Sequence, residues 1–200
     1  MSERAGFECV VKISGAPVVM TGEATTATGN ISYQITNTVK QVLDRDTPPT
    51  VLDGGVATGE SYSVNYLTGT VTFGSASART ITITGKYLPM TVAASATRMS
   101  RADEVVALDI TKFNNTHRQK LQGLKSASGT LAHLNMADTT FADAILAGDP
   151  VVIEDRTKST DEPNRTWALL SSEETAAAVD GVQNQTVSWV SYDDWLRLGG

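Results

Sequence analysis

The residues that could carry catalysis or bind a metal are few and far apart. The chain has two histidines, His117 and His133, and a single cysteine, Cys9. General acid–base catalysis, an activated nucleophile or a metal centre needs several such groups close together. One histidine falls in a polar segment and the other in an alternating one, so we interpret both as surface or hydrogen-bonding residues. Cys9 lies in an apolar strand candidate, where a small buried hydrophobe is expected.

Two acidic segments were considered as binding sites. Residues 44–46 (DRD) resemble half of a calcium loop, but the remaining ligand spacing is missing. Residues 193–194 (DD) precede Trp195 and could contact a sugar, although a polar tail anchored by an aromatic ring is the better interpretation. Phosphate-binding loops, nucleophile elbows and zinc-protease motifs are absent from the sequence. The sequence therefore predicts a protein that is not an enzyme and has no catalytic, cofactor-binding or metal site.

Composition sets further bounds on the class of protein. The 200 residues carry a formal net charge of −6, which argues against a nucleic-acid reader held by basic patches. Apolar residues make up 40% and charged residues 19%, as in a folded domain. One cysteine cannot build an intramolecular disulfide framework. No apolar stretch approaches the length of a membrane span, and the first residues do not predict a signal peptide.

Alternating β-branched and aromatic residues dominate the chain and predict strands. Ile31, Tyr33 and Ile35 alternate with polar residues, and we expect this strand to continue through residues 39–43. A hairpin is predicted over residues 62–73, with Gly69 supplying positive φ at its turn. Other strands are expected at residues 7–13, 17–20, 80–84, 105–113, 124–134, 151–154, 167–170 and 182–192.

The remaining segments are predicted as one helix and several loops. Residues 138–148 have an apolar stripe and end at Gly148, with Pro150 just beyond, which is typical of a helix terminus. Loops are expected at residues 24–30, 93–102, 114–120 and 158–165, and a loop or short helical turn at residues 171–180.

These elements predict a mainly β protein, an antiparallel β-sandwich or barrel with one flanking α-helix. Turn-forming residues are dense over residues 44–60, which we expect to form a long loop. We expect residues 61–87 to form an extra hairpin region, inserted relative to the smallest members of the family whose resemblance is described below. We expect the whole of residues 1–200 to form a single domain.

The order of segments in the second half of the chain resembles that of a known protein family. Its segments are residues 123–129 (GLKSASG), 138–141 (DTTF), 146–149 (LAGD), 151–154 (VVIE), 167–172 (WALLSS) and 185–189 (QTVSW). Over about residues 105–192 the chain resembles the major tail tube protein of long-tailed phages with non-contractile, siphovirus-type tails. That family is similar in fold to the tube proteins of contractile tails and type VI secretion. Residues 65–73 also look like segments common in phage structural proteins.

The resemblance implies a structural subunit of the virion. Six copies would form a ring, and rings would stack into a tube through which double-stranded DNA leaves. The implied partners are the chain itself and the tail initiator, tape-measure and terminator proteins, with DNA touched only in transit and non-specifically. A location in the phage tail, assembly in the host cytoplasm, no membrane and no cofactor follow from the same resemblance.

Two sets of residues are candidates for roles in such a tube. The long connection over residues 44–60 could become ordered when rings stack. Its candidate ring-stacking residues are Asp44, Arg45, Asp46, Pro48, Pro49, Asp53 and Glu60. A weakly polar face could line the bore and contact DNA without gripping it, through Ser32, Gln34, Thr36 and Thr38. A different class stays open, a β-sandwich binding module such as a capsid decoration or a glycan-binding, adhesin-like protein.

Overall fold

The structure is a computed structural model that describes residues 10–92, 96–110, 117, 120–133, 140–156, 161–176 and 184–196. These residues form two seven-stranded sheets and one α-helix, and the strand pairs are antiparallel, so the predicted mainly β fold is confirmed. Contacts divide the chain into two compact units: residues 1–92, 153–165 and 196–200, and residues 93–152 and 166–195. The expected single domain over residues 1–200 stays a prediction.

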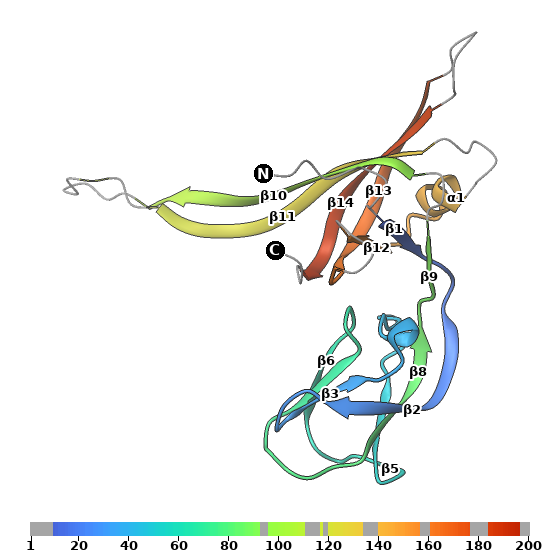
Figure 1. Cartoon of the computed structure of the whole chain (residues 1–200). Coiled ribbons are helices and arrows are strands. Elements are labelled where there is room, and N and C mark those ends of the chain that lie inside the picture. Colours follow the sequence, from blue (N-terminus) through green and yellow to red (C-terminus); the bar gives the residue numbers. More distant parts are fainter. Residues whose placement is uncertain are drawn as a thin grey trace. The chain divides into compact units, whose positions relative to one another are not determined.

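One sheet belongs to unit 1 and has the strand order β5-β4-β8-β2-β3-β7-β6. Its strands are β2 (Val18–Ala27), β3 (Ser32–Ile35), β4 (Thr50–Asp53), β5 (Val56–Ala57), β6 (Tyr62–Asn65), β7 (Thr70–Phe73) and β8 (Ile81–Tyr87). The sheet curls around a core (Figure 1) that contains Met20, Tyr33, Ile35, Leu43, Val51, Val71, Phe73, Ile81 and Ile83. The alternating residues that predicted strands are the ones whose side chains fill this core.

The predicted hairpin is confirmed as β6 and β7. Tyr62 pairs with Phe73 and Asn65 with Thr70, and the Asn65 side chain accepts hydrogen bonds from two backbone amides in the turn. Gly69 has φ +63°, and a Cβ there would lie 2.7 Å from the carbonyl oxygen of Gln41. Both the backbone angle and the close approach therefore require glycine.

The other sheet has the order β10-β11-β14-β13-β12-β1-β9. Its strands are β1 (Val10–Ser14), β9 (Met90–Val92), β10 (Ala96–Asp109), β11 (Lys120–His133), β12 (Val151–Arg156), β13 (Asn164–Ala176) and β14 (Asn184–Leu196). β10 and β11 form a long hairpin in unit 2, from Ala96↔His133 to Asp109↔Lys120 (Figure 1). The pairing of β11 with β14 covers only Ser128–His133, so the hairpin extends beyond β14.

The predicted helix is confirmed as α1 (Thr140–Ala147). Gly148 has φ +69° and its amide donates to the carbonyl of Ala144, which is the expected glycine terminus. Phe141 is buried on the apolar side of the helix. The first predicted residues of the helix, 138–139, lie outside the described residues.

Five predicted loops are wrong in part, because strand pairing extends into polar sequence. β11 begins at Lys120 and β13 at Asn164, inside the expected loops 114–120 and 158–165. β2 continues to Ala27 through its pairing with β3, although residues 24–30 were expected to be a loop. β10 begins at Ala96, inside the expected loop 93–102, because β11 offers a partner along its full length. β13 continues to Ala176, where a loop or helical turn was expected.

The strand predicted from Ile31 is shorter than expected. β3 ends at Ile35, and a 3₁₀ turn, η2 (Thr38–Lys40), follows, so the continuation through residues 39–43 is wrong. The Asn37 side chain accepts a hydrogen bond from the amide of Val39 and thereby caps this turn. Within the expected long loop 44–60, β4 and β5 form a small hairpin, so the segment is not a loop throughout.

Candidate functional site

A buried carboxylate on β12 organises the most densely charged cluster among the described residues. Glu154 is 1% exposed and lies opposite Lys12 of β1 in the strand register. Its Oε1 receives Lys12 Nζ at 3.1 Å and Arg156 Nη2 at 3.0 Å, and its Oε2 receives Arg165 Nε at 2.8 Å. Arg165, 5% exposed, also donates through Nη1 to the carbonyl of Leu67 at 2.6 Å.

The basic side chains decide the ionisation of this carboxyl. Burial by itself raises the pKa of Glu154, but the hydrogen bonds and charges of Arg165 and Lys12 outweigh it and hold the pKa below its ordinary value. Glu154 is therefore charged at neutral pH. Removing its partners would leave a buried charge uncompensated.

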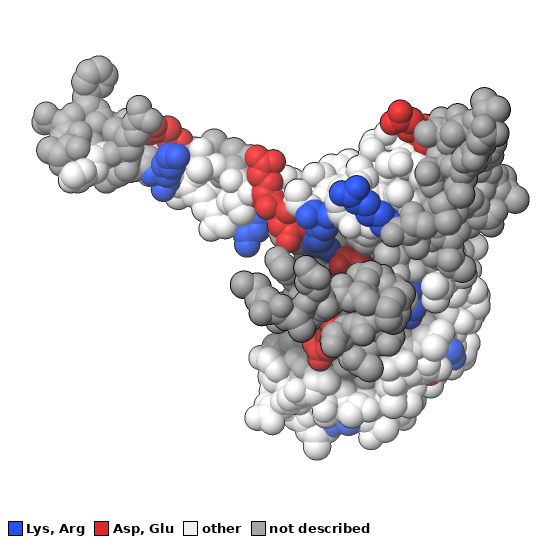
Figure 2. Space-filling view, turned by 45° about the horizontal axis from the view of Figure 1, so that its top comes forward, with Lys and Arg blue, Asp and Glu red and all other residues white. Residues whose placement is uncertain are grey.

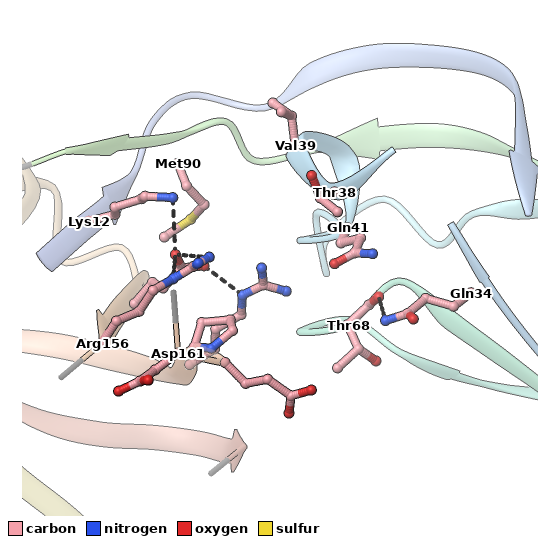
Figure 3. Close-up of a pocket in the computed structure, with 13 residues that line it drawn as sticks. Lys12, Gln34, Thr38, Val39, Gln41, Thr68, Met90, Arg156 and Asp161 are labelled. Carbon is pink, nitrogen blue, oxygen red and sulfur yellow. Dashed lines mark hydrogen bonds and ion pairs between the residues drawn. The ribbon is translucent and has the colours of Figure 1, made fainter. Parts of the chain in front are cut away.

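This cluster forms one wall of a cavity of about 430 Å³ that lies within unit 1 (Figure 3). The lining residues are Lys12, Gln34, Thr38, Val39, Gln41, Thr68, Met90, Glu154, Arg156, Asp161, Glu162, Pro163 and Arg165. Two amide side chains in the lining are held in place, since Gln34 donates to the carbonyl of Thr68 at 3.1 Å and Gln41 to that of Ile35 at 3.0 Å. The cavity thus combines fixed neutral polar groups with three basic and three acidic side chains.

A second charged pair lies on the curled sheet of unit 1. Arg79 Nη2 meets Glu60 Oε2 at 2.9 Å, and the guanidinium stacks over the ring of Phe73 at 4.1 Å from its centroid. The hydrogen bond to Arg79 lowers the pKa of Glu60, and the same bond raises the pKa of Arg79. The Arg79 side chain is only 2% exposed, so this pair closes the edge of the core rather than presenting a free cation.

The candidate ring-stacking residues do not form one loose segment. Asp44 is buried, and its Oδ1 accepts a hydrogen bond from the amide of Asp46 at 3.1 Å. The carbonyl of the buried Pro49 accepts from the Tyr62 hydroxyl, and Asp53 Oδ1 accepts from the amide of Thr80 at 3.0 Å. Of this set, Arg45, Asp46, Pro48 and Glu60 are exposed. A role in stacking stays a prediction, and these exposed members are the ones that could contact a neighbour.

The candidate lumen residues are only partly on one strand. Ser32 and Gln34 lie on β3, whereas Thr36 follows its end and Thr38 belongs to η2. Ser32 Oγ lies 3.2 Å from Thr72 Oγ1, and Thr36 Oγ1 lies 2.8 Å from Thr26 Oγ1. Gln34 and Thr38 instead line the cavity described above. A role in lining a bore stays a prediction.

The outer half of the β10–β11 hairpin is the most exposed strand pair in the structure's described part. Over residues 102–109 and 120–125, the residues whose burial is described are exposed, apart from the half-buried Gly123, and the Asp103 side chain, paired with Arg101, is 22% exposed. Three of the exposed side chains are large and apolar: Val105 at 46%, Leu121 at 54% and Leu124 at 86%. The described side chains of this ribbon are therefore largely exposed to solvent. Among the described strands, β10 is the terminal strand of its sheet, and no other described strand pairs with its outer edge.

Other candidates are placed as follows. His117 is exposed. Cys9 lies outside the described residues, as do the side chains of His133, Asp193 and Asp194. In the described part of the chain, no three acidic, histidine or cysteine side chains gather closely enough to hold a metal ion. Within the same segments, no helix has the length and apolar character needed to cross a membrane.

Charge is distributed without a single dominant patch on the face in Figure 2. There, acidic and basic side chains are interspersed among uncharged residues over the described surface.

Sequence comparisons give no match, since no protein-family model and no curated protein matches the chain. Two solved structures are similar in fold, each at 14% identity. A chain in the virion of a native gene transfer agent particle has a TM-score of 0.47, with 53% of this chain and 86% of that one covered. A chain in the tail of an empty gene transfer agent particle, refined with C6 helical symmetry, has a TM-score of 0.49, with 54% and 85% covered. Similarity at this level does not establish a shared function.

Proposed function

We propose that the chain is a structural subunit of a phage tail tube. The supporting observation is the outer half of the β10–β11 hairpin, whose described side chains are largely exposed over residues 102–109 and 120–125. A two-stranded ribbon is at best marginally stable by itself in water. It needs additional strands or an apolar surface, which further copies of the same chain can supply.

Closure into a ring satisfies this requirement for every copy. The open edge of β10 can pair with a strand of the next subunit, and a closed ring leaves no edge without a partner. Exposed Val105, Leu121 and Leu124 would then be covered by the neighbour. A hexameric ring, and the stacking of rings into a tube, are the arrangement that the resemblance to tail tube proteins implies.

Passage of double-stranded DNA agrees with the charge of the chain. A formal net charge of −6 repels phosphates, so DNA can pass without being held. The proposed partners are other copies of the chain and the tail initiator, tape-measure and terminator proteins, in a tail assembled in the host cytoplasm. The exposed part of residues 44–60 is the proposed contact between stacked rings.

The glycan-binding alternative has less support. Among the described side chains, aromatic residues are buried or half-buried except for Tyr192, which is 52% exposed. A sugar site built on stacked aromatic rings would need an exposed cluster of them. We therefore prefer the tail tube subunit.

The test compares two leucines of almost equal exposure. Leu124 on the hairpin is 86% exposed and Leu146 on α1 is 85% exposed, and both belong to unit 2. The purified chain is concentrated and analysed by size-exclusion chromatography with light scattering and by negative-stain microscopy. We expect the wild type and Leu146→Lys to form rings or hollow rods of uniform diameter. Leu124→Lys should remain monomeric, because a charge cannot be buried in the new contact.

Two outcomes would contradict the proposal. A wild-type chain that stays monomeric at every concentration, even with a tail initiator complex present, argues against a tube subunit. Leu124→Lys rings as abundant as those of the wild type would show that the hairpin is not the contact.

A further inference from the structure

The outer half of the β10–β11 hairpin, residues 102–109 and 120–125, can be approached by a further strand from either side. Among the described strands, β10 is the terminal strand of its sheet. The described pairing of β11 with β14 covers Ser128–His133 and does not reach residues 120–125. Both long edges of this ribbon therefore offer backbone groups to a strand of another molecule.

The two strands of the ribbon carry opposite charges. Residues 102–109 of β10 (ADEVVALD) contain three acidic residues and no basic one. Residues 120–125 of β11 (KLQGLK) contain two lysines and no acidic residue. Part of this charge is compensated within the hairpin, since Asp103 pairs with Arg101 and Asp109 lies opposite Lys120 in the register.

Glu104 and Lys125 show the difference between the strands most clearly. Glu104 is exposed and lies opposite the uncharged Ser126, and Lys125 is exposed and lies opposite the uncharged Val105. Within the hairpin, neither of them faces a charge of the other sign across the strands. The β10 edge is therefore negative and the β11 edge positive.

Ribbons of two copies can meet edge to edge in two ways. Pairing of like edges, β10 with β10 or β11 with β11, is two-fold and ends at a dimer, whereas pairing of β11 with β10 is head-to-tail and continues to a ring or a filament. Like edges bring charges of the same sign together, which destabilises strand pairs, and unlike edges bring opposite charges together. When the ribbons point the same way, β11 of one copy runs antiparallel to β10 of the next, as it does to β10 within the hairpin.

We propose that the β11 edge of one copy pairs with the β10 edge of a second copy, and that the opposite charges of the two strands select this head-to-tail arrangement over the two-fold one. The inference rests on the proposed function, because its partner is another copy of the same chain. It goes further by naming the partner strand and the physical reason why assembly does not stop at a dimer.

The test exchanges the charges of the two strands. The exchange variant is Glu104→Lys/Asp109→Lys/Lys120→Asp/Lys125→Glu, which reverses the sign of both edges and keeps the net charge. Its own β10 and β11 edges remain opposite in sign, so we expect it to assemble by itself as the wild type does. Against the wild type, however, every head-to-tail contact joins edges of the same sign.

Equal amounts of the dilute wild type and the isotope-labelled exchange variant are mixed, concentrated at low salt and analysed by native mass spectrometry. We expect the two chains to sort into separate rings, with mixed rings at least about tenfold rarer than random mixing predicts. The control is Asp149→Lys/Glu174→Lys, which changes exposed acidic residues outside the ribbon and should mix with the wild type at random. A smaller exchange, Glu104→Lys/Lys125→Glu, should sort in the same direction without altering the Asp109–Lys120 pair.

Three results would overturn the inference. Mixed assemblies in excess of random mixing would show that like edges pair, because the wild type and the exchange variant then attract each other. Random mixing of both exchange variants with the wild type would show that these charges do not select the arrangement. A wild-type chain that never associates refutes the proposed function and this inference together, whereas wild-type rings that mix at random refute this inference alone.

Discussion

At the scale of single residues, the fold contains a buried charged side chain, Glu154, that the sequence pattern did not identify. Glu154 is 1% exposed, yet the pKa of its carboxyl is lowered, because Arg165 and Lys12 stabilise the ionised form. A buried ion pair of this kind contributes little net stability relative to an apolar pair, but loss of one member is costly. The members also differ in how well they can be replaced, since three cations bond to the one carboxylate of Glu154.

We expect removal of the anion to be more harmful than removal of a cation. Glu154→Leu should lower the free energy of unfolding by about 3–5 kcal/mol, because the buried Arg165 is left without its counter-charge. Arg165→Leu should cost less, about 2 kcal/mol, because Lys12 and Arg156 still compensate Glu154. Urea denaturation at neutral pH measures both. Glu162→Gln is the exposed control, with a change within about 0.5 kcal/mol, and equal losses for both buried variants would contradict this account.

The same carboxyl predicts a dependence of stability on pH. The folded pKa of Glu154 lies below its ordinary value of 4.5, so its contribution is fully present above that pH and is lost as the pH falls through the folded value. Melting temperatures of the wild type and Glu154→Gln, measured from pH 7 to pH 3, should therefore converge as the medium becomes acidic. A constant gap across this range would show that ionisation of Glu154 does not stabilise the fold.

At the scale of elements, the close packing of β11 between β10 and β14 depends on a glycine. Gly129 pairs with Arg101 on one side and with Trp189 on the other. A Cβ at Gly129 would lie 2.0 Å from the carbonyl oxygen of Ser100 and 2.8 Å from Cζ2 of Trp189. The buried ring of Trp189 thus occupies the space where a side chain would stand, and the pairing of three strands depends on this space.

Gly129→Ala should lower the free energy of unfolding by about 3 kcal/mol, because a strand or the tryptophan ring must shift. The intrinsic fluorescence of Trp189 should also change, because the ring moves out of its present packing position. Gly74→Ala is the control, since a Cβ there has nothing within 4 Å. A Gly129→Ala protein as stable as the wild type would show that β10 and β14 do not hold β11 this tightly.

At the scale of the whole molecule, the proposed roles of the exposed ribbon and of the connection 44–60 in assembly call for different tests. The ribbon, residues 102–109 and 120–125, can change without touching a core, which is why Leu124 is the residue to test. The connection cannot be removed as a block, because Val51 of β4 is 1% exposed in the core of unit 1. Tests of ring stacking should therefore substitute its exposed members, such as Arg45 and Pro48, and leave β4 in place.

The local sequence pattern was enough to predict the strands whose apolar residues alternate and the helix that ends at a glycine. Strand β3, the β6–β7 hairpin and β8 follow from alternating apolar residues, and the end of α1 follows from Gly148. Only the tertiary structure showed that β10 begins at Ala96 and that β13 reaches Ala176, because a polar segment becomes a strand when a neighbour offers backbone hydrogen bonds along its length. The charge cluster likewise joins Lys12 to Glu154 and Arg165 across more than a hundred residues, and no spacing in the sequence marks residues that meet only after the strands have paired.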